Sequence, residues 1–221
     1  MRHKSFLPLI FALMGLMASC SGYRYTQGDN PFQQYGVNSL SVPMFYNYSS
    51  MPEVASSFTR ETYKLLTGFS GLRLRSGWST NTDAVLIGII RSEEKIRDVI
   101  TPQNLRVAQG VAEENIGTQR PEFYVPGASR VSLILQVVVV KRPTSEEIAL
   151  LRSELGQKLL PQGKILFNES FKLDEAFNRE IFDNEGGSVV ATQNSGALRR
   201  TKDTLALRAA EQIRDMILYA F

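Results

Sequence analysis

Cysteine and histidine, two side chains that often carry enzyme chemistry, each occur once in this sequence, and both lie near its start. Cys20 is the single cysteine and His3 is the single histidine. If residues 1–19 are removed on export, the mature chain has no histidine, and its one thiol is at its first residue. Ser-His-Asp and Cys-His catalysis are then excluded, as are zinc and iron sites built from imidazole or thiolate. A carboxylate pair or a Ser-Lys dyad stays open for an enzyme, but no spacing arranges one, so we expect a binding or assembly role and no catalysis.

Residues 1–19 have the pattern of a signal peptide. Arg2, His3 and Lys4 form a basic start, and an apolar run of about twelve residues containing Pro8 follows. A membrane-spanning helix needs about twenty apolar residues. The run therefore favours a cleaved export signal over a transmembrane anchor.

The signal ends in Leu16-Met17-Ala18-Ser19-Cys20, which resembles the lipobox of bacterial lipoproteins, although Met17 stands where leucine is preferred. The resemblance implies cleavage by signal peptidase II and covalent acyl and diacylglycerol lipids on Cys20, with no other cofactor expected. Ser21 follows, not the aspartate associated with inner-membrane retention, which implies the periplasmic face of the outer membrane. The alternative is an ordinary secretory signal with an incidental cysteine, which would leave a reactive thiol in an oxidising compartment.

The charge of the mature chain is close to neutral. The full sequence has 25 basic and 22 acidic side chains, and loss of Arg2 and Lys4 leaves 23 basic ones, a net charge near +1. No nucleic-acid partner is implied by this charge or by the compartment.

The apolar spacing predicts an α+β fold, with two main helices packed on one face of a mostly antiparallel four- to five-stranded sheet. Helices are expected over residues 52–69 and from about 195 to the end, and an extra inserted helix is expected after the capping-box sequence Thr144-Ser145-Glu146-Glu147, to about Leu159. Strands are expected within residues 36–48, 72–75, 83–99, 130–141 and 164–176. Residues 101–129 and 183–194 lack regular patterning and are expected to be loops. The domain would span residues 36–221, behind a lipidated tether over residues 20–35.

Several short segments, in this order, resemble the LptE family of LPS-assembly lipoproteins. They are Cys20 followed by Gly22-Tyr23-Arg24, a strand and an amphipathic helix, the segment Thr82-Asp83-Ala84-Val85-Leu86-Ile87-Gly88 opening a strand, and a closing helix. The resemblance implies a lipoprotein that plugs the LptD β-barrel, and the pair inserts lipopolysaccharide into the outer leaflet. Ser21 before Gly22, the long 101–129 connection and the inserted helix near 147–159 depart from the family pattern. The competing class is a free-standing envelope binding module that activates a peptidoglycan synthase or serves a lipid transporter.

Strand-mounted cations are the candidate lipopolysaccharide-binding residues, because lipid A carries phosphates and the guanidinium fork suits bidentate phosphate contact. They are Arg73, Arg75, Arg91, Lys95 and Arg97. The alternative is that these charges only protect sheet edges. Trp78 is interpreted either as an interface anchor or as a cap over the core edge.

Overall fold

The computed structural model describes residues 28–79, 81–92, 100–107, 124–151, 161, 163–180 and 187–220. Cys20, the segment Gly22-Tyr23-Arg24, Lys95 and Arg97 lie outside these ranges. The lipidation site and two of the five candidate cations therefore remain predictions from sequence.

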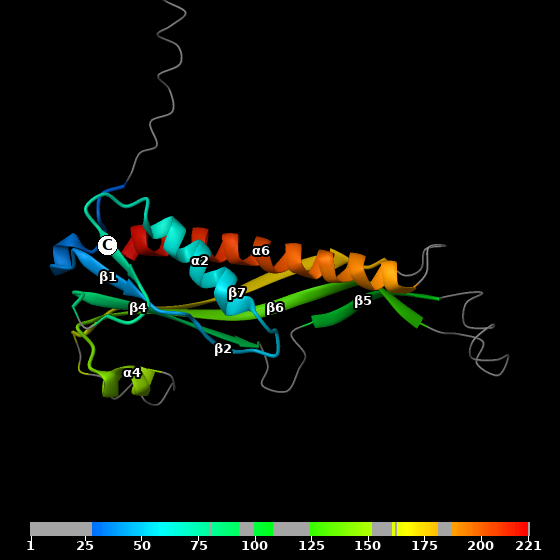
Figure 1. The fold of residues 1–221 in the computed structure, drawn as a ribbon, viewed down its shortest axis with the longest axis horizontal. Coiled ribbons are helices and arrows are strands. Elements are labelled where there is room, and N and C mark those ends of the chain that lie inside the picture. Colours follow the sequence, from blue (N-terminus) through cyan, green and yellow to red (C-terminus); the bar gives the residue numbers. More distant parts are fainter. Residues whose placement is uncertain are drawn as a thin grey trace, which may run out of the picture.

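One mixed sheet organises the described part of the chain (Figure 1). It contains seven strands: β1 (Ser39–Val42), β2 (Tyr46–Tyr48), β3 (Arg73–Ser76), β4 (Ala84–Ser92), β5 (Ile100–Val107), β6 (Tyr124–Lys141) and β7 (Ile165–Asn178). The three long pairings, β4 with β6, β5 with β6 and β6 with β7, are antiparallel. The three short pairings, β1 with β3, β1 with β4 and β2 with β4, are parallel.

Strand β6 is the central element, and its pairing partners show how the sheet is built. Strand β7 pairs with it from Ala128 to Val140 and so occupies one edge. The other edge is shared, because β5 pairs with the first part of β6 and β4 pairs with the part from Leu133 to Lys141. Strands β4 and β5 therefore lie end to end along β6.

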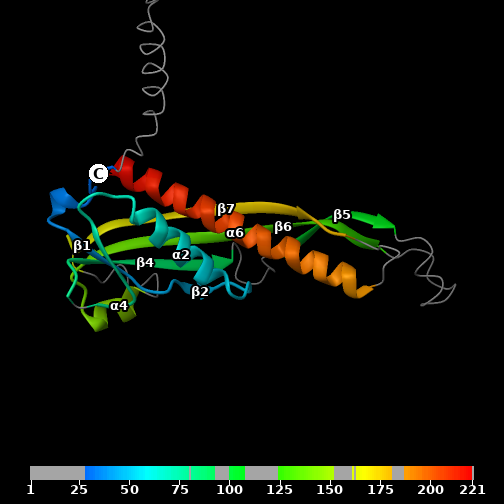
Figure 2. The same ribbon diagram turned by 45° about the horizontal axis from the view of Figure 1, so that its top comes forward.

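Two helices cover one face of the sheet, and a third lies on the other face (Figures 1 and 2). Helix α2 (Val54–Leu66) and helix α6 (Gly187–Ala220) pack against each other and against the strands. The main core joins Phe58 of α2 and Ile213 of α6 to alternate residues of β6 such as Leu135. Short helix α4 (Ser145–Leu151) inserts Leu151 into a second cluster with Ile87 and Val138 on the opposite face. Burial on both faces explains why β4 and the end of β6 are continuous apolar runs.

The α+β class and the two main helices on one face are confirmed, but the strand count is larger than predicted. The predicted loop 101–129 contains most of β5 and the start of β6. Pro102 weakens the strand pattern there, yet among the described strands β5 pairs with β6 alone, so its other edge tolerates a residue without an N–H. The strand expected within 36–48 is two strands, β1 and β2, separated by Pro43 and its neighbours.

Helix α6 begins at Gly187, so the prediction that residues 183–194 form a loop is wrong for its last part. The polar side chain of Asn194 explains the difference. Its amide Nδ2 donates to the Glu180 carbonyl at 2.9 Å, and its Oδ1 accepts from the Glu180 N–H at 3.0 Å. A tertiary contact of this kind stabilises a helical turn that lacks an apolar stripe.

The capping box at the start of α4 is confirmed in atomic detail. The Thr144 N–H donates to Glu147 Oε2 at 2.8 Å, and the Glu147 N–H donates to Thr144 Oγ1 at 3.2 Å. Lys164 Nζ lies 2.6 Å from Glu147 Oε1 and ties the helix to the start of β7. This ion pair with Lys164 is the main cause that holds the pKa of Glu147 below its ordinary value. The rest of the predicted helix, to Leu159, lies outside the described residues.

Candidate functional site

Residues 28–35, the described part of the predicted 20–35 tether, are joined to the domain by hydrogen bonds. The Ser70 N–H donates to the Gly28 carbonyl at 2.9 Å, and Asp29 forms an isolated parallel bridge with Ser70. The buried side chain of Asn30 donates to the Val37 carbonyl at 2.7 Å and accepts from the Phe32 N–H at 3.0 Å. Phe32 and Val37 are fully buried. The chain is therefore fixed to the folded domain from Gly28 onward.

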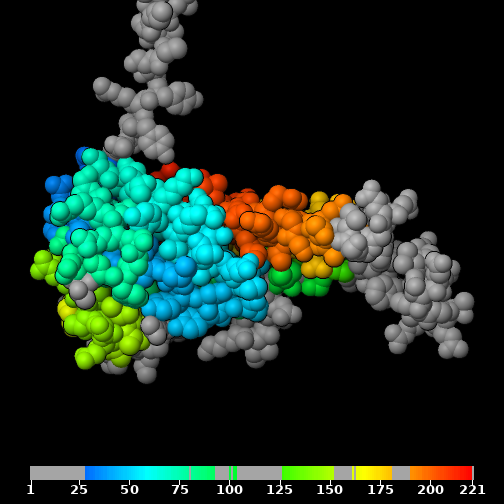
Figure 3. Space-filling view, in the orientation of Figure 1, coloured from blue at the N-terminus to red at the C-terminus, as the bar shows by residue number. Residues whose placement is uncertain are grey.

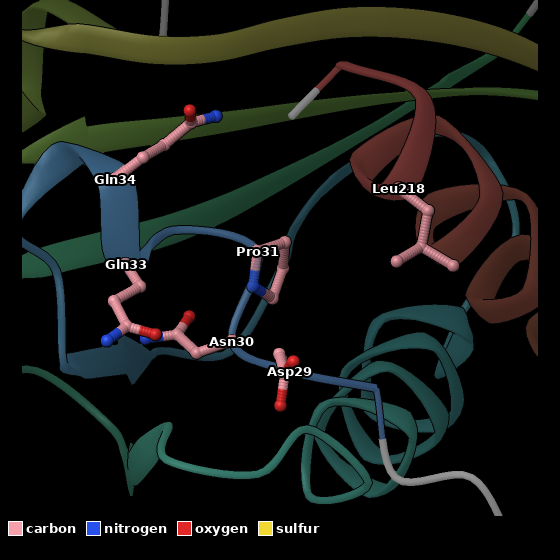
Figure 4. Close-up of a pocket in the computed structure, with 6 residues that line it drawn as sticks. All are labelled: Asp29, Asn30, Pro31, Gln33, Gln34 and Leu218. Carbon is pink, nitrogen blue, oxygen red and sulfur yellow. The ribbon is translucent and has the colours of Figure 1, made fainter.

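An open hollow of about 590 Å³ lies at this same end (Figure 4). It lies between the N-terminal segment and the last turns of α6, and it is lined by Asp29, Asn30, Pro31, Gln33, Gln34 and Leu218. Leu218 is 50% exposed, and the neighbouring Tyr219 is 91% exposed. The last turn of α6 thus presents apolar surface beside Asp29 and Pro31.

The structure places the described candidate cations in two separate positions. Arg73 and Arg75 are exposed on edge strand β3, level with Ser39 and Ser41 of β1. Ser41 is level with Val85 of β4, and Arg91 lies six residues further along that strand. At about 3.3 Å per residue, roughly 20 Å separates Arg91 from Arg75 along the strand direction, and Arg73 lies two residues farther away. The five-residue patch is not tested, because Lys95 and Arg97 lie outside the described ranges.

Arg142 and Lys141, the basic residues at the end of β6, have structural partners. Lys141 Nζ donates to the Tyr35 carbonyl at 2.8 Å. Arg142 has a left-handed backbone, with a φ of 42°, and its guanidinium lies 3.5 Å from the Asp83 carboxylate. These contacts hold the short 3-10 helix η2 (Gln33–Tyr35) and the start of β4 against the end of β6. Trp78, the other residue singled out from sequence, is 46% exposed.

The segment Thr82–Gly88, which carries part of the family resemblance, has structural roles. The Asp83 carboxylate accepts from the Asn38 N–H at 3.1 Å, from the Ser39 N–H at 3.0 Å and from the Ser39 hydroxyl at 2.8 Å. The bond from the Ser39 hydroxyl is the main cause that lowers the pKa of Asp83 below its ordinary value, and the Asn38 N–H adds to it. Asp83 thereby links the start of β4 to the start of β1.

Gly88, at the other end of this segment, allows a close approach of the Phe45 ring. A Cβ atom at Gly88 would lie 2.2 Å from Phe45 Cδ2, a distance that no side chain tolerates. The ring therefore packs directly on the backbone of β4. Glycine is required at this position for packing, which is a property of the fold and not of a binding site.

A second hollow, of about 570 Å³, lies at the other end of the domain, between β7 and the first half of α6. Its lining is mostly polar and includes Glu175, Glu180, Asn194, Arg200 and Thr204. Arg208 of α6 forms an ion pair with Glu175 of β7. Sequence reasoning did not single out these residues, because they come from a strand and a distant helix and no local motif joins them.

No protein-family model matches the sequence, and no curated protein matches it significantly. None of the helices in the described part of the chain combines the length and apolar character needed to cross a bilayer.

Solved structures similar to this chain include bacterial lipoproteins. Rare lipoprotein B of Shewanella oneidensis aligns with a TM-score of 0.39 and 10% identity, over 82% of this chain and 98% of that chain. Lipoprotein GNA1162 of Neisseria meningitidis aligns with a TM-score of 0.33 and 11% identity, over 73% of this chain and 96% of that chain. The PelC dodecamer of Paraburkholderia phytofirmans aligns with a TM-score of 0.33 and 10% identity, over 77% of this chain and 88% of that chain. Likeness at these TM-scores says nothing about function.

Proposed function

We propose that this protein is a lipoprotein of the bacterial envelope, held by lipids on Cys20 at the periplasmic face of the outer membrane, and that it assembles with a partner and does not catalyse a reaction. One observation carries the proposal: the single cysteine of the chain stands at the end of a lipobox-like signal. Two or more acyl chains give stable anchoring where one gives only marginal binding. The firmly held segment at Gly28, eight residues further on, suits a domain that is tethered from this end.

We further propose that the partner is an LptD-like outer-membrane β-barrel and that the pair serves lipopolysaccharide insertion. The resemblance to the LptE family supports this partner, and the described elements follow the order that the resemblance implies: a strand, an amphipathic helix, the Thr82–Gly88 segment opening β4, and a long closing helix. Arg73 and Arg75, exposed on the edge strand, are two candidate contacts for lipid A phosphates.

The anchor is tested by fractionating membranes on a density gradient and measuring the mass of the N-terminal peptide. Wild-type protein is expected in the outer-membrane fraction with a lipidated Cys20, and the Cys20→Ala variant is expected to disappear from that fraction. A matched variant, Ser21→Asp, should keep its lipid but move to the inner membrane. A processed protein whose Cys20 carries no lipid would refute the anchor.

The partner is tested by capturing the tagged, lipidated protein from detergent-solubilised outer membranes and identifying what is bound. A large β-barrel protein in stoichiometric amount supports the assembly role. Recovery of an inner-membrane enzyme or transporter in its place would overturn the barrel partner and favour an envelope binding module.

A further inference from the structure

The last turn of α6 carries two adjacent exposed apolar residues. Before it, the exposed positions Glu211, Gln212, Arg214 and Asp215 are polar or charged, while Ile213 and Ile217 are buried in the core. Leu218 and Tyr219 then follow, 50% and 91% exposed. Leu207, at 51%, is the other large apolar side chain exposed on the described part of this helix, but it stands alone, whereas Leu218 and Tyr219 are adjacent and Tyr219 is almost fully exposed. Two neighbouring apolar side chains at the helix end are the candidate contact surface.

The position of this turn identifies what covers it. Leu218 lines the same hollow as Asp29 and Pro31, so it lies beside the point where the tether enters (Figure 4). Gly28 follows Cys20 by eight residues, and a fully extended chain of that length spans at most about 28 Å. Lipids on Cys20 would therefore hold this end of the domain close to the bilayer surface, while the start of α6 lies about 50 Å away along the helix.

We propose that Leu218 and Tyr219 of α6 rest in the headgroup region of the bilayer that holds Cys20, so that the domain stands on the membrane by this end. The inference rests on the lipid anchor of the proposed function. A tyrosine ring has an apolar body and a polar tip, which suits a bilayer interface. Arg73, three residues after Ser70 at the tether entry, adds an exposed cation for anionic headgroups.

The short linker from Cys20 to Gly28 allows the small contact of Leu218 and Tyr219 with the bilayer to form. Two apolar side chains would hold a free protein on a membrane only weakly. A short linker turns the second contact into an intramolecular event, with an effective concentration in the millimolar range. The lipids then supply attachment, and the helix end supplies orientation.

The test uses the full-length lipidated protein reconstituted into vesicles of phosphatidylethanolamine and phosphatidylglycerol, with and without brominated acyl chains. Trp78→Phe removes the single tryptophan, and Tyr219→Trp places a reporter in the last turn. Leu207→Trp, at a residue that is 51% exposed on the same helix and twelve residues earlier, is the matched control. We expect brominated lipid to reduce the emission of the Tyr219→Trp protein at least twofold and to leave the control almost unchanged.

Flotation of the vesicles separates the two hypotheses. If both reporters float with the lipid but neither is quenched, or both are quenched equally, the anchor stands and the contact by α6 is refuted. If neither floats, the lipid anchor fails and the inference fails with it. Circular dichroism checks that each variant is folded, which the exposure of both positions leads us to expect.

Discussion

Replacing Gly88 by alanine tests whether this glycine is required for packing of the Phe45 ring against β4, as the structure indicates. The new Cβ would lie 2.2 Å from one atom of the Phe45 ring and 2.4 Å from two others. An ordinary van der Waals contact is about 3.5–4.0 Å, so the ring would have to retreat by more than 1 Å. Phe45 is 3% exposed, and its backbone N–H is bound to Thr59 Oγ1 at 2.9 Å, so the ring has little room to move.

The expected magnitude follows from two opposing effects. Overpacking of a core costs about 1–3 kcal/mol. Alanine also restricts the unfolded chain more than glycine does, which stabilises the folded state by about 0.4–1 kcal/mol. Because the overlap involves three ring atoms, we expect the upper part of the first range and a net loss of about 2 kcal/mol. With a slope of about 2 kcal/mol per molar urea, the unfolding midpoint should fall by about 1 M.

Urea unfolding of the mature chain, followed by far-ultraviolet circular dichroism, measures this change. Gly196→Ala is the matched control, because its Cβ would lie 3.7 Å from the nearest atom, on Arg200, and glycine inside a helix costs about 1 kcal/mol relative to alanine. Its midpoint should rise. In a Phe45→Leu background, without the ring, Gly88→Ala should cost at least 1 kcal/mol less than in the wild type. A midpoint for Gly88→Ala equal to that of the wild type, or a cost that Phe45→Leu leaves unchanged, would refute the packing argument.

Two further predictions concern local polar contacts. Because the pKa of Asp83 is lower in the folded than in the unfolded chain, its contribution to stability is present above the unfolded pKa of about 3.9 and is lost as the pH falls through the folded value. Asp83→Asn should therefore lower the free energy of unfolding at pH 7 by about 1–3 kcal/mol, measured from urea unfolding. The difference from wild type should shrink below about pH 4. A difference that does not change with pH would contradict the role given to the Asp83 carboxylate. Thr144→Ala removes one hydrogen bond of the capping box and should lower the local stability of α4 by about 1 kcal/mol. Amide hydrogen exchange over Ser145–Leu151 should then be about fivefold faster, while the global unfolding midpoint stays the same. Unchanged exchange would contradict the role of the cap.

Sequence patterns predicted the helices and strands whose apolar spacing is visible within their own residues. The alternation in β6 and the helical spacing of Leu205, Ala209 and Ile213 correspond to side chains that lie in the core. The capping box is local in sequence and was therefore visible. The fold class follows from these elements, because each has one face or stripe that must be buried.

The elements that sequence reasoning missed depend on partners far along the chain. Strand β5 contains Pro102 and little apolar alternation, and it is a strand because β6 pairs with it. The first turns of α6 are helical beside the contact between Asn194 and Glu180, which are 14 residues apart. The two hollows also join distant segments. No spacing rule places Leu218 beside Asp29, so the candidate surface at the tether was found only from the fold.

The end-to-end placement of β4 and β5 along β6 makes the domain long and narrow (Figure 3). Strand β6 has 18 residues and extends over about 60 Å. If the proposed anchor holds the end of the domain near Gly28, the opposite end, near Glu180 and Asn194, lies farther from the point of attachment than the thickness of a bilayer's hydrocarbon core. Removing or adding two residues in both β5 and the part of β6 that pairs with it would move the end near Glu180 by about 7 Å. The same side chains would still face the core, because side chains alternate with a period of two.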